Sequence, residues 1–171
     1  MRKVFLLSIA VLGMSIGIKA QKFAYIDSEY ILKNIPAYEA AKQQLDQYAA
    51  EWQKEIEKYY AEIDKMYKDY QSEKVLMTED MKKKREDEIL QKEKEAKELQ
   101  KKYFGPEGEL YKKRQELMKP IQDEIYNAVK EIANEGNYDM IFDVADKTIL
   151  LYTNPKYDKS DEVLKKLGYK N

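Results

Sequence analysis

Tyrosines, lysines and carboxylates are the reactive side chains that this 171-residue chain offers, because it has no histidine and no cysteine. Histidine general bases, cysteine nucleophiles and nearly every zinc site are therefore excluded. Acidic residues are plentiful, but the sequence places no Asp/Glu pair in an apolar strand-end pocket such as a two-carboxylate glycosidase would need. We expect a protein that is not an enzyme and has no cofactor or metal.

Fifteen tyrosines are the most prominent candidate binding groups. Tyr59 and Tyr70 belong to an apolar heptad pattern, where packing explains a ring more simply than binding. Tyr48, Tyr60 and Tyr67 flank that pattern, where amphipathic rings offer weak contacts that tolerate many sequences. We predict that these three tyrosines contact a bound partner chain.

The element that positions these rings is a long helix beginning at Pro36, since the fixed φ of proline suits a first helical position. Apolar residues then recur every seven positions, in one series of Tyr38, Leu45, Trp52, Tyr59 and Met66 and a second of Ala49, Ile56, Ile63 and Tyr70. Sevenfold spacing over five repeats indicates a left-handed coiled coil. An ordinary amphipathic helix would drift away from this spacing.

A second helix should return along the first, starting where Thr78 can act as its N-cap. Its seam is half polar, because Ile89, Ala96 and Tyr103 alternate with Arg85, Lys92 and Leu99. We predict an antiparallel hairpin whose helices join at residues 72–78. The stretch YFGPEGEL, residues 103–110, should interrupt the return helix, and Pro120 should interrupt it again where the chain bends into the body.

The turn between the two helices carries an apolar triplet that has no obvious seam to enter: Val75, Leu76 and Met77. Exposed apolar patches usually mark interaction surfaces, and methionine adapts to varied partners. We predict that the triplet binds a client, with burial inside the turn itself as the alternative.

One basic run follows the turn: Lys82, Lys83, Lys84 and Arg85. Residues 79–102 as a whole carry nine basic and eight acidic side chains, so the run is first interpreted as a solvated helix face. Contact with lipid phosphates of a membrane, with lipopolysaccharide or with an acidic client is the alternative.

The remaining segments predict a small body. Phe23–Ile26 is typical of a strand, as are YDMIFDV at residues 138–144 and TILLYT at 148–153. Residues 160–167 predict a short last helix stopped by Gly168, and Gly136 suits a left-handed helix cap before the strands. The first strand should pair with one of the later two. A small body without disulfides needs partners, so we expect oligomerisation through the sheet.

The first twenty residues predict a cleaved secretory signal peptide, with Arg2 and Lys3 before an apolar core and Ala20 at the cut. Removal of this segment leaves 28 basic and 32 acidic side chains, a net charge of −4. This balance does not favour nucleic acid as a partner.

In this order, the segments resemble one known family. YIDSEYILKNIP near the start and KKRQELMKPIQDEIYNAVKEIANEGNYDMIFDV near the end are similar to the Skp/OmpH family of periplasmic outer-membrane-protein chaperones. The resemblance covers residues 22–171, and its specificity comes from the ordered set of elements.

The resemblance implies an α+β fold, mostly α, with a small β-sheet body and a long antiparallel coiled-coil hairpin, or tentacle, assembling as a trimer. The expected divisions are a signal peptide at residues 1–20, a β-rich body and oligomerisation region at 21–35 and 120–171, and a hairpin arm at 36–119. The implied function is that of an ATP-independent periplasmic holdase, which keeps unfolded outer-membrane β-barrel proteins soluble.

Two features bear on that function. Well-known members of the family are strongly basic, whereas this chain is mildly acidic, so we expect apolar and tyrosine contacts to hold a client instead of global charge. The alternative function is a structural coiled-coil spacer or adaptor of the cell envelope. A fixed partner would favour a rigid apolar return helix, whereas this one is jointed and half polar.

Overall fold

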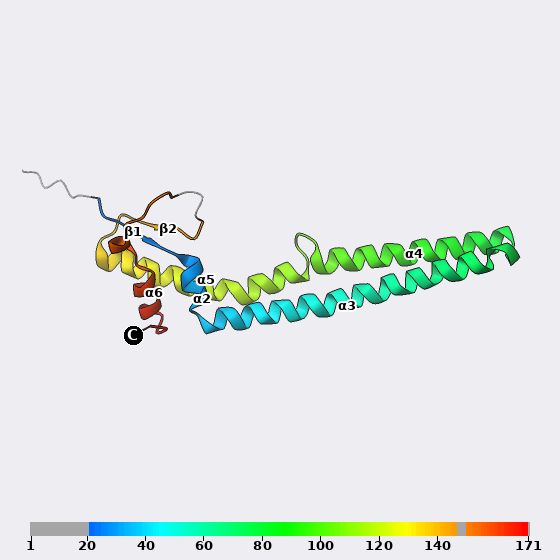
Figure 1. Cartoon of the computed structure of the whole chain (residues 1–171), viewed down its shortest axis with the longest axis horizontal. Coiled ribbons are helices and arrows are strands. Elements are labelled where there is room, and N and C mark those ends of the chain that lie inside the picture. Colours follow the sequence, from blue (N-terminus) through cyan, green and yellow to red (C-terminus); the bar gives the residue numbers. More distant parts are fainter. Residues whose placement is uncertain (1–20, 147–149, 171) are drawn as a thin grey trace, which may run out of the picture. The chain divides into compact units, whose positions relative to one another are not determined.

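The computed structural model describes residues 21–146 and 150–170, and it divides the chain into two compact units (Figure 1). The body unit comprises Met1–Ile31 and Asn127–Asn171, and the arm unit comprises Leu32–Tyr126. The expected signal peptide lies outside the described residues. The functional division into residues 21–35 with 120–171, and 36–119, stays a prediction.

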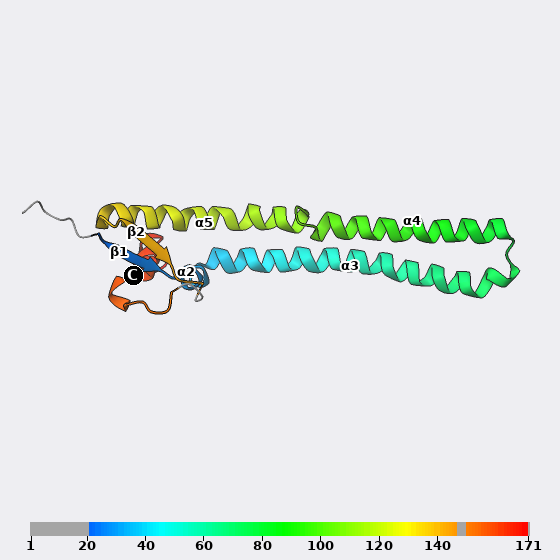
Figure 2. The same cartoon turned by 90° about the horizontal axis from the view of Figure 1, so that it is seen from above.

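The arm unit is built from long helices. Helix α3 (Pro36–Glu73) begins at Pro36, and the 3-10 turn η1 (Lys74–Leu76) follows it. Helix α4 (Glu79–Phe104) begins after Thr78, whose hydroxyl accepts a hydrogen bond from the Met81 backbone N–H at 3.3 Å. These starts and this cap confirm the sequence predictions. Both cartoon views show α4 lying alongside α3 (Figures 1 and 2).

The apolar seam between α3 and α4 follows the sevenfold pattern. The buried side chains of the two helices include Leu45, Ile56, Ile63, Ile89, Ala96 and Tyr103. The other heptad positions of α3 are half-buried. Each fully buried isoleucine contributes roughly 1.5–3 kcal/mol by leaving water, so the seam accounts for why the helices pair.

The polar positions of the seam are satisfied by partners on α3. Lys92 lies 2.7 Å from a carboxylate oxygen of Glu62, and its ammonium is 4.3 Å from the centre of the Tyr59 ring. The hydrogen bond that Lys92 donates to the Glu62 carboxylate raises the pKa of Lys92. Arg85 lies 3.6 Å from Glu73. The half-polar seam therefore joins the helices by charged pairs at their margin.

The predicted interruption of the return helix is confirmed, because α4 ends at Phe104 and α5 (Glu109–Gly136) begins five residues later. Figure 1 shows the connecting loop bulging out between the two helices. A Cβ on Gly105 would lie 2.3 Å from a backbone carbonyl oxygen of the preceding turn, and one on Gly108 would lie 2.8 Å from two such oxygens. Only glycine fits at these positions without a shift of the backbone.

Pro120 does not interrupt its helix, and that prediction was wrong. Helix α5 runs through Pro120 to Gly136. Proline removes the hydrogen bond to the carbonyl of Glu116. Both residues are exposed, so water can hydrate that carbonyl, and the apolar face that holds the helix remains intact.

The body unit contains a two-stranded parallel sheet. Strand β1 (Phe23–Ile26) pairs with β2 (Met140–Asp143), with Phe23 opposite Met140 and Ile26 opposite Asp143. This pairing confirms that the first strand finds its partner after residue 138. Ala24 and Ile26 point into the core, while Phe23 and Phe142 lie on the exposed face.

The predicted strand at residues 148–153 is not formed in its described part. Thr148 and Ile149 lie outside the described residues, and residues 150–153 are irregular. Leu151 is 99% exposed and Tyr152 is 80% exposed. A segment that is apolar on both faces needs cover on both sides to form a buried strand, and the described part of this single chain gives it none.

The body unit contains the short helix α6 (Ser160–Lys166) and most of a second short helix, α2 (Ser28–Lys33), which the sequence analysis missed. The short 3-10 turn η2 (Pro155–Tyr157) precedes α6. The buried apolar residues of this unit include Ala24, Ile26, Ile31, Ala128, Ile132, Val163 and Leu164. Gly168, at φ +82°, stops α6 as predicted.

The left-handed residue after α5 is Asn137, at φ +50°, and not Gly136. A Cβ on Gly136 would lie 2.2 Å from the Tyr138 ring, so a larger residue there would displace that ring. The prediction of a left-handed Gly136 was therefore wrong, although the helix ends where expected.

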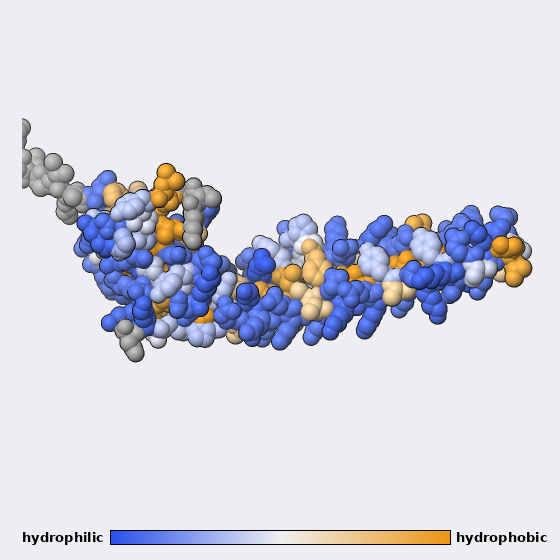
Figure 3. Space-filling model, in the orientation of Figure 1, coloured by the Kyte–Doolittle hydropathy of each residue, from blue (hydrophilic) through white to orange (hydrophobic). Residues whose placement is uncertain are grey.

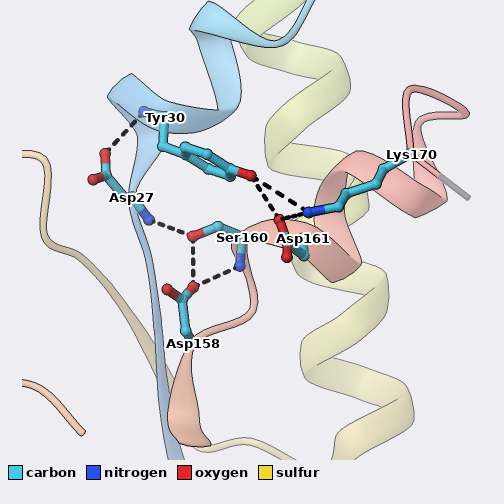
Figure 4. Close-up of polar contacts among 6 residues, drawn as sticks. All are labelled: Asp27, Tyr30, Asp158, Ser160, Asp161 and Lys170. Carbon is cyan, nitrogen blue, oxygen red and sulfur yellow. Dashed lines mark hydrogen bonds and ion pairs between the residues drawn. The ribbon is translucent and has the colours of Figure 1, made fainter. Parts of the chain in front are cut away.

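Hydrogen bonds tie the C-terminal segment to the start of the chain (Figure 4). The buried Ser160 hydroxyl accepts from the Asp27 backbone N–H at 2.8 Å and donates to Asp158 at 2.6 Å. The Tyr30 hydroxyl donates to Asp161 at 2.9 Å, and Lys170 lies 2.7 Å from the same carboxylate. Lys170 and Tyr30 thereby hold the pKa of Asp161 below its usual range. Together these contacts fix α6 against β1 and α2.

Candidate functional site

The end of the arm unit presents the predicted apolar triplet. Val75 is 84% exposed and Leu76 is 89% exposed, whereas Met77 is half-buried. Met81 in the first turn of α4, which the sequence analysis did not include, is also exposed, at 53%. The space-filling view shows an apolar patch at this end of the unit (Figure 3). Burial within the turn is thus limited to Met77.

The basic run is largely offset by neighbouring acids. Lys82 pairs with Glu79 at 2.7 Å, and Arg85 lies between Glu73 and Glu88 at 3.6 and 3.8 Å. Lys83 and Lys84 line a cavity of about 570 Å³, whose wall also contains several carboxylates: Asp80, Asp87, Glu88 and Glu95. This mixture supports the interpretation of the run as a solvated helix face. Lys83 and Lys84 are more available to an acidic partner than Lys82 and Arg85, which have ion pairs.

The three candidate tyrosines have different surroundings. Tyr48 is stacked on Trp52, with ring centroids 5.5 Å apart, so much of its ring is used in packing. Tyr60 is 45% exposed and Tyr67 is 42% exposed. Tyr60 and Tyr67 therefore offer ring surface to a partner, and Tyr48 offers less than predicted. A role of any of them in binding stays a prediction.

Three tyrosine hydroxyls donate hydrogen bonds to glutamates across the helix pair. Tyr67 donates to Glu93 at 2.9 Å, and Tyr103 donates to Glu55 at 2.7 Å. Tyr70 also donates to a carboxylate oxygen of α4. In each case the carboxylate acceptor raises the pKa of the phenol. The neutral phenols therefore link α3 to α4 at ordinary pH.

The sequence analysis did not identify one exposed apolar surface of this helix pair. Leu90 is 64% exposed, although it adjoins the buried Ile89. It lines a cavity of about 250 Å³ together with Tyr67, Tyr70, Glu86, Ile89 and Glu93. Leu90 falls one position outside the heptad, and this offset is the signal that could have revealed an apolar residue turned away from the seam.

The body unit has an apolar groove of its own. The groove has a volume of about 810 Å³ and lies over the exposed face of the sheet, where the Phe23 and Phe142 rings are 6.2 Å apart. Leu150 and Tyr152 also line it. Met140 on the same strand is 56% exposed. This face of the sheet is therefore apolar, and the described part of the single chain leaves it largely uncovered.

The described residues show no group of three or more metal-ligating side chains placed to hold an ion. Among the helices described, none combines the length and apolar character required to cross a bilayer.

Known proteins share the sequence pattern and the fold of this chain. The family model described as outer membrane protein (OmpH-like) matches residues 22–167. A crystal structure from Caulobacter crescentus, of a candidate outer membrane chaperone (OmpH-like), aligns with a TM-score of 0.67 and 13% sequence identity. The alignment covers 88% of this chain and 86% of that one, and at this identity it shows a shared fold. A search of curated protein sequences found no significant match.

Long paired helices with an exposed apolar end occur here in one chain with a small sheet. The chain belongs to the OmpH-like family, whose model spans most of its length. Membership in this family supports a general role as a chaperone.

Proposed function

We propose that the protein is an ATP-independent periplasmic holdase, which binds unfolded outer-membrane β-barrel proteins and keeps them soluble. The observation that carries this proposal is the exposed end of the arm unit, where Val75 and Leu76 leave most of their surface in water. A folded protein gains nothing in stability from such exposure, so the surface fits a role in binding. Membership in the OmpH-like family supports the chaperone class.

The arm surface suits a client that has no fixed shape. Its exposed apolar and aromatic groups are spread along the helices as small separate contacts: Tyr60, Tyr67, Val75, Leu76, Met81 and Leu90. Each such contact is weak, and several arms acting together would add affinity by multivalency while the client stays mobile. This arrangement favours a holdase over the alternative of a structural spacer or adaptor, which would present one continuous surface to a fixed partner.

We propose further that the chain assembles as a trimer through its sheet. The uncovered face around Phe142 and the exposed Leu151 and Tyr152 support assembly, because a second copy would remove this apolar surface from water. Resemblance to the Skp/OmpH family supports the number three. Multi-angle light scattering on the mature chain should give three times the monomer mass, and a monomer at micromolar concentrations would rule out this mode of assembly.

The test of holdase activity is the aggregation of a urea-unfolded outer-membrane β-barrel after dilution, followed by light scattering without nucleotide. We expect the mature protein to suppress aggregation, and a variant with Val75, Leu76 and Met77 replaced by serine to suppress it less. A matched control replaces three exposed residues of α3 by serine: Gln44, Gln53 and Gln71. Suppression that is absent in the wild type, or equal in the tip variant and the wild type, would contradict the proposal.

A further inference from the structure

The cavity beside Leu90 has an apolar floor and a negatively charged rim. Ile89 is 3% exposed and forms the floor, while Leu90, at 64% exposure, forms a wall. Glu86 and Glu93 lie one on each side, two helical turns apart on α4. We call this surface the Leu90 groove, meaning the cavity lined by Tyr67, Tyr70, Glu86, Ile89, Leu90 and Glu93.

The two carboxylates of the Leu90 groove are held in place but not neutralised. Tyr67 donates to Oε1 of Glu93, and Tyr70 donates to Oε1 of Glu86, so a neutral phenol orients each group. Within the described part of the chain, neither glutamate forms an ion pair with a lysine or arginine. By contrast, Glu62 on the facing helix α3 does form an ion pair, because Lys92 lies 2.7 Å from its carboxylate. Two fixed negative charges therefore border an apolar surface.

The other side of α4 is built differently. By the 100° rotation per residue of an α-helix, Glu88 and Glu95 lie on the opposite side from Glu86 and Glu93. The cavity on that side contains Lys83, Lys84 and Lys92 beside its four carboxylates, so most of its negative charge is balanced within the cavity wall. The Leu90 groove is thus the side of the helix pair that combines exposed apolar surface with uncompensated negative charge.

We propose that the Leu90 groove binds segments of unfolded client in which an apolar side chain is adjacent to a lysine or arginine. The apolar side chain, or the aliphatic stem of the cation, packs on Leu90 and Ile89, and each cationic head reaches the second oxygen of either Glu86 or Glu93. This inference rests on the proposed holdase function, and it adds the kind of segment that the arm selects. The partner is identified by charge complementarity.

The test uses the mature protein and three fluorescein-labelled dodecapeptides, which alternate Phe with Lys, Phe with Glu, and Ser with Lys. Fluorescence anisotropy should show binding of the Phe/Lys peptide and much weaker binding of the other two. In the variant Glu86→Gln with Glu93→Gln, we expect the Phe/Lys peptide to bind about threefold to tenfold more weakly, because two exposed ion pairs are lost. Glutamine still accepts the tyrosine hydrogen bonds, so the helix pair should keep its circular dichroism spectrum.

The matched control is Glu88→Gln with Glu95→Gln, which makes the same change of charge on the other side of α4. It should leave binding of the Phe/Lys peptide unchanged, whereas Leu90→Ser should weaken it. Equal binding of the Phe/Glu peptide, or an equal loss in the control variant, would overturn the proposal. If the protein still suppresses β-barrel aggregation, such a result would refute client binding at the Leu90 groove but not the holdase function. Failure of suppression in the wild type would instead refute the holdase function.

Discussion

The indole of Trp52 in α3 and the phenol of Tyr103 in α4 lie in nearly parallel planes, with ring centroids 4.9 Å apart and 4° between the planes. Tyr103 occupies the last turn of α4, next to the loop that separates α4 from α5. The stack therefore attaches the return helix to α3 at the joint. Since Trp52 is the single tryptophan of the chain, its fluorescence reports on this joint alone.

Replacement of Trp52 by alanine should loosen the helix pair. A fully buried tryptophan costs about 3–5 kcal/mol on truncation, and half-burial of Trp52 reduces the expected loss to roughly 2–3 kcal/mol. Urea unfolding followed by circular dichroism measures this loss. The mass in solution should not change, because the body unit is proposed to carry assembly. Dissociation of the oligomer would show that the arms take part in it.

Gly108→Ala should disturb the joint, since the added Cβ meets two backbone oxygens at 2.8 Å. We expect a destabilisation of about 1–3 kcal/mol, as for overpacking elsewhere, together with a shift of the Trp52 emission. Glu107→Ala, an exposed change in the same loop, is the control and should leave both the melting temperature and the emission unchanged.

Alkaline pH should open the α3–α4 pair. The hydrogen bonds to glutamates raise the pKa values of Tyr67, Tyr70 and Tyr103 above the ordinary 10.0. A raised pKa in the folded state means that the contribution to stability is complete below about pH 10 and is lost as the pH rises through the folded-state values. Stability measured by urea unfolding should therefore fall more steeply above pH 10 in the wild type than in a Tyr→Phe triple variant. Parallel pH profiles would contradict this role of the phenols.

Holding activity should depend little on salt. The charges of residues 79–102 nearly cancel, so screening over about 10 Å at 0.1 M removes little net attraction. Suppression of aggregation should change by less than about twofold between roughly 0.05 and 0.5 M salt. Neutralisation of Lys82, Lys83, Lys84 and Arg85 with glutamine should have a small effect. A steep loss of holding activity with salt, together with a loss of activity in this variant, would contradict this prediction. It would indicate that the basic run binds acidic clients or lipid phosphates.

Ser160→Ala should destabilise the body unit. Ser160 is 3% exposed, and its loss leaves the Asp27 N–H without its acceptor, at an expected cost of about 1–3 kcal/mol. Thermal unfolding followed by circular dichroism measures the change. Lys170→Ala, which removes an exposed ion pair to Asp161, is the comparison and should matter much less.

Local and periodic features of the fold were predictable from the sequence. The start at Pro36, the cap at Thr78 and the buried Ile56 and Ile63 each follow from rules that act within one or two turns of helix. Pro120 was misjudged because packing of an apolar face can outweigh one missing hydrogen bond. Residues 148–153 were misjudged because their pattern requires cover that the described single chain does not supply.

The candidate site was less accessible to prediction. The heptad located Val75 and Leu76 outside the seam, and both are exposed. The links from Tyr67 to Glu93 and from Tyr103 to Glu55 depend on the register between two helices, which spacing within one helix does not set. For the same reason the sequence alone did not show which carboxylates would be left without a cation.

The pairing of β1 with β2 also orders the folding of the chain. Lys22 and Asp139, bonded at the start of the sheet, are 117 residues apart, whereas Tyr70 and Glu86 at the end of the arm unit are 16 apart. Contacts close in sequence form sooner, because closing a short loop loses less chain entropy. The helix pair can close from η1 onward and shorten the loop that the sheet must span. Pulse-labelled hydrogen exchange should then show amides of α3 and α4 protected before those of β1. A chain synthesised N-terminus first thus carries an unpaired strand until residue 143 has followed, so the protein must itself survive a period with an exposed strand edge.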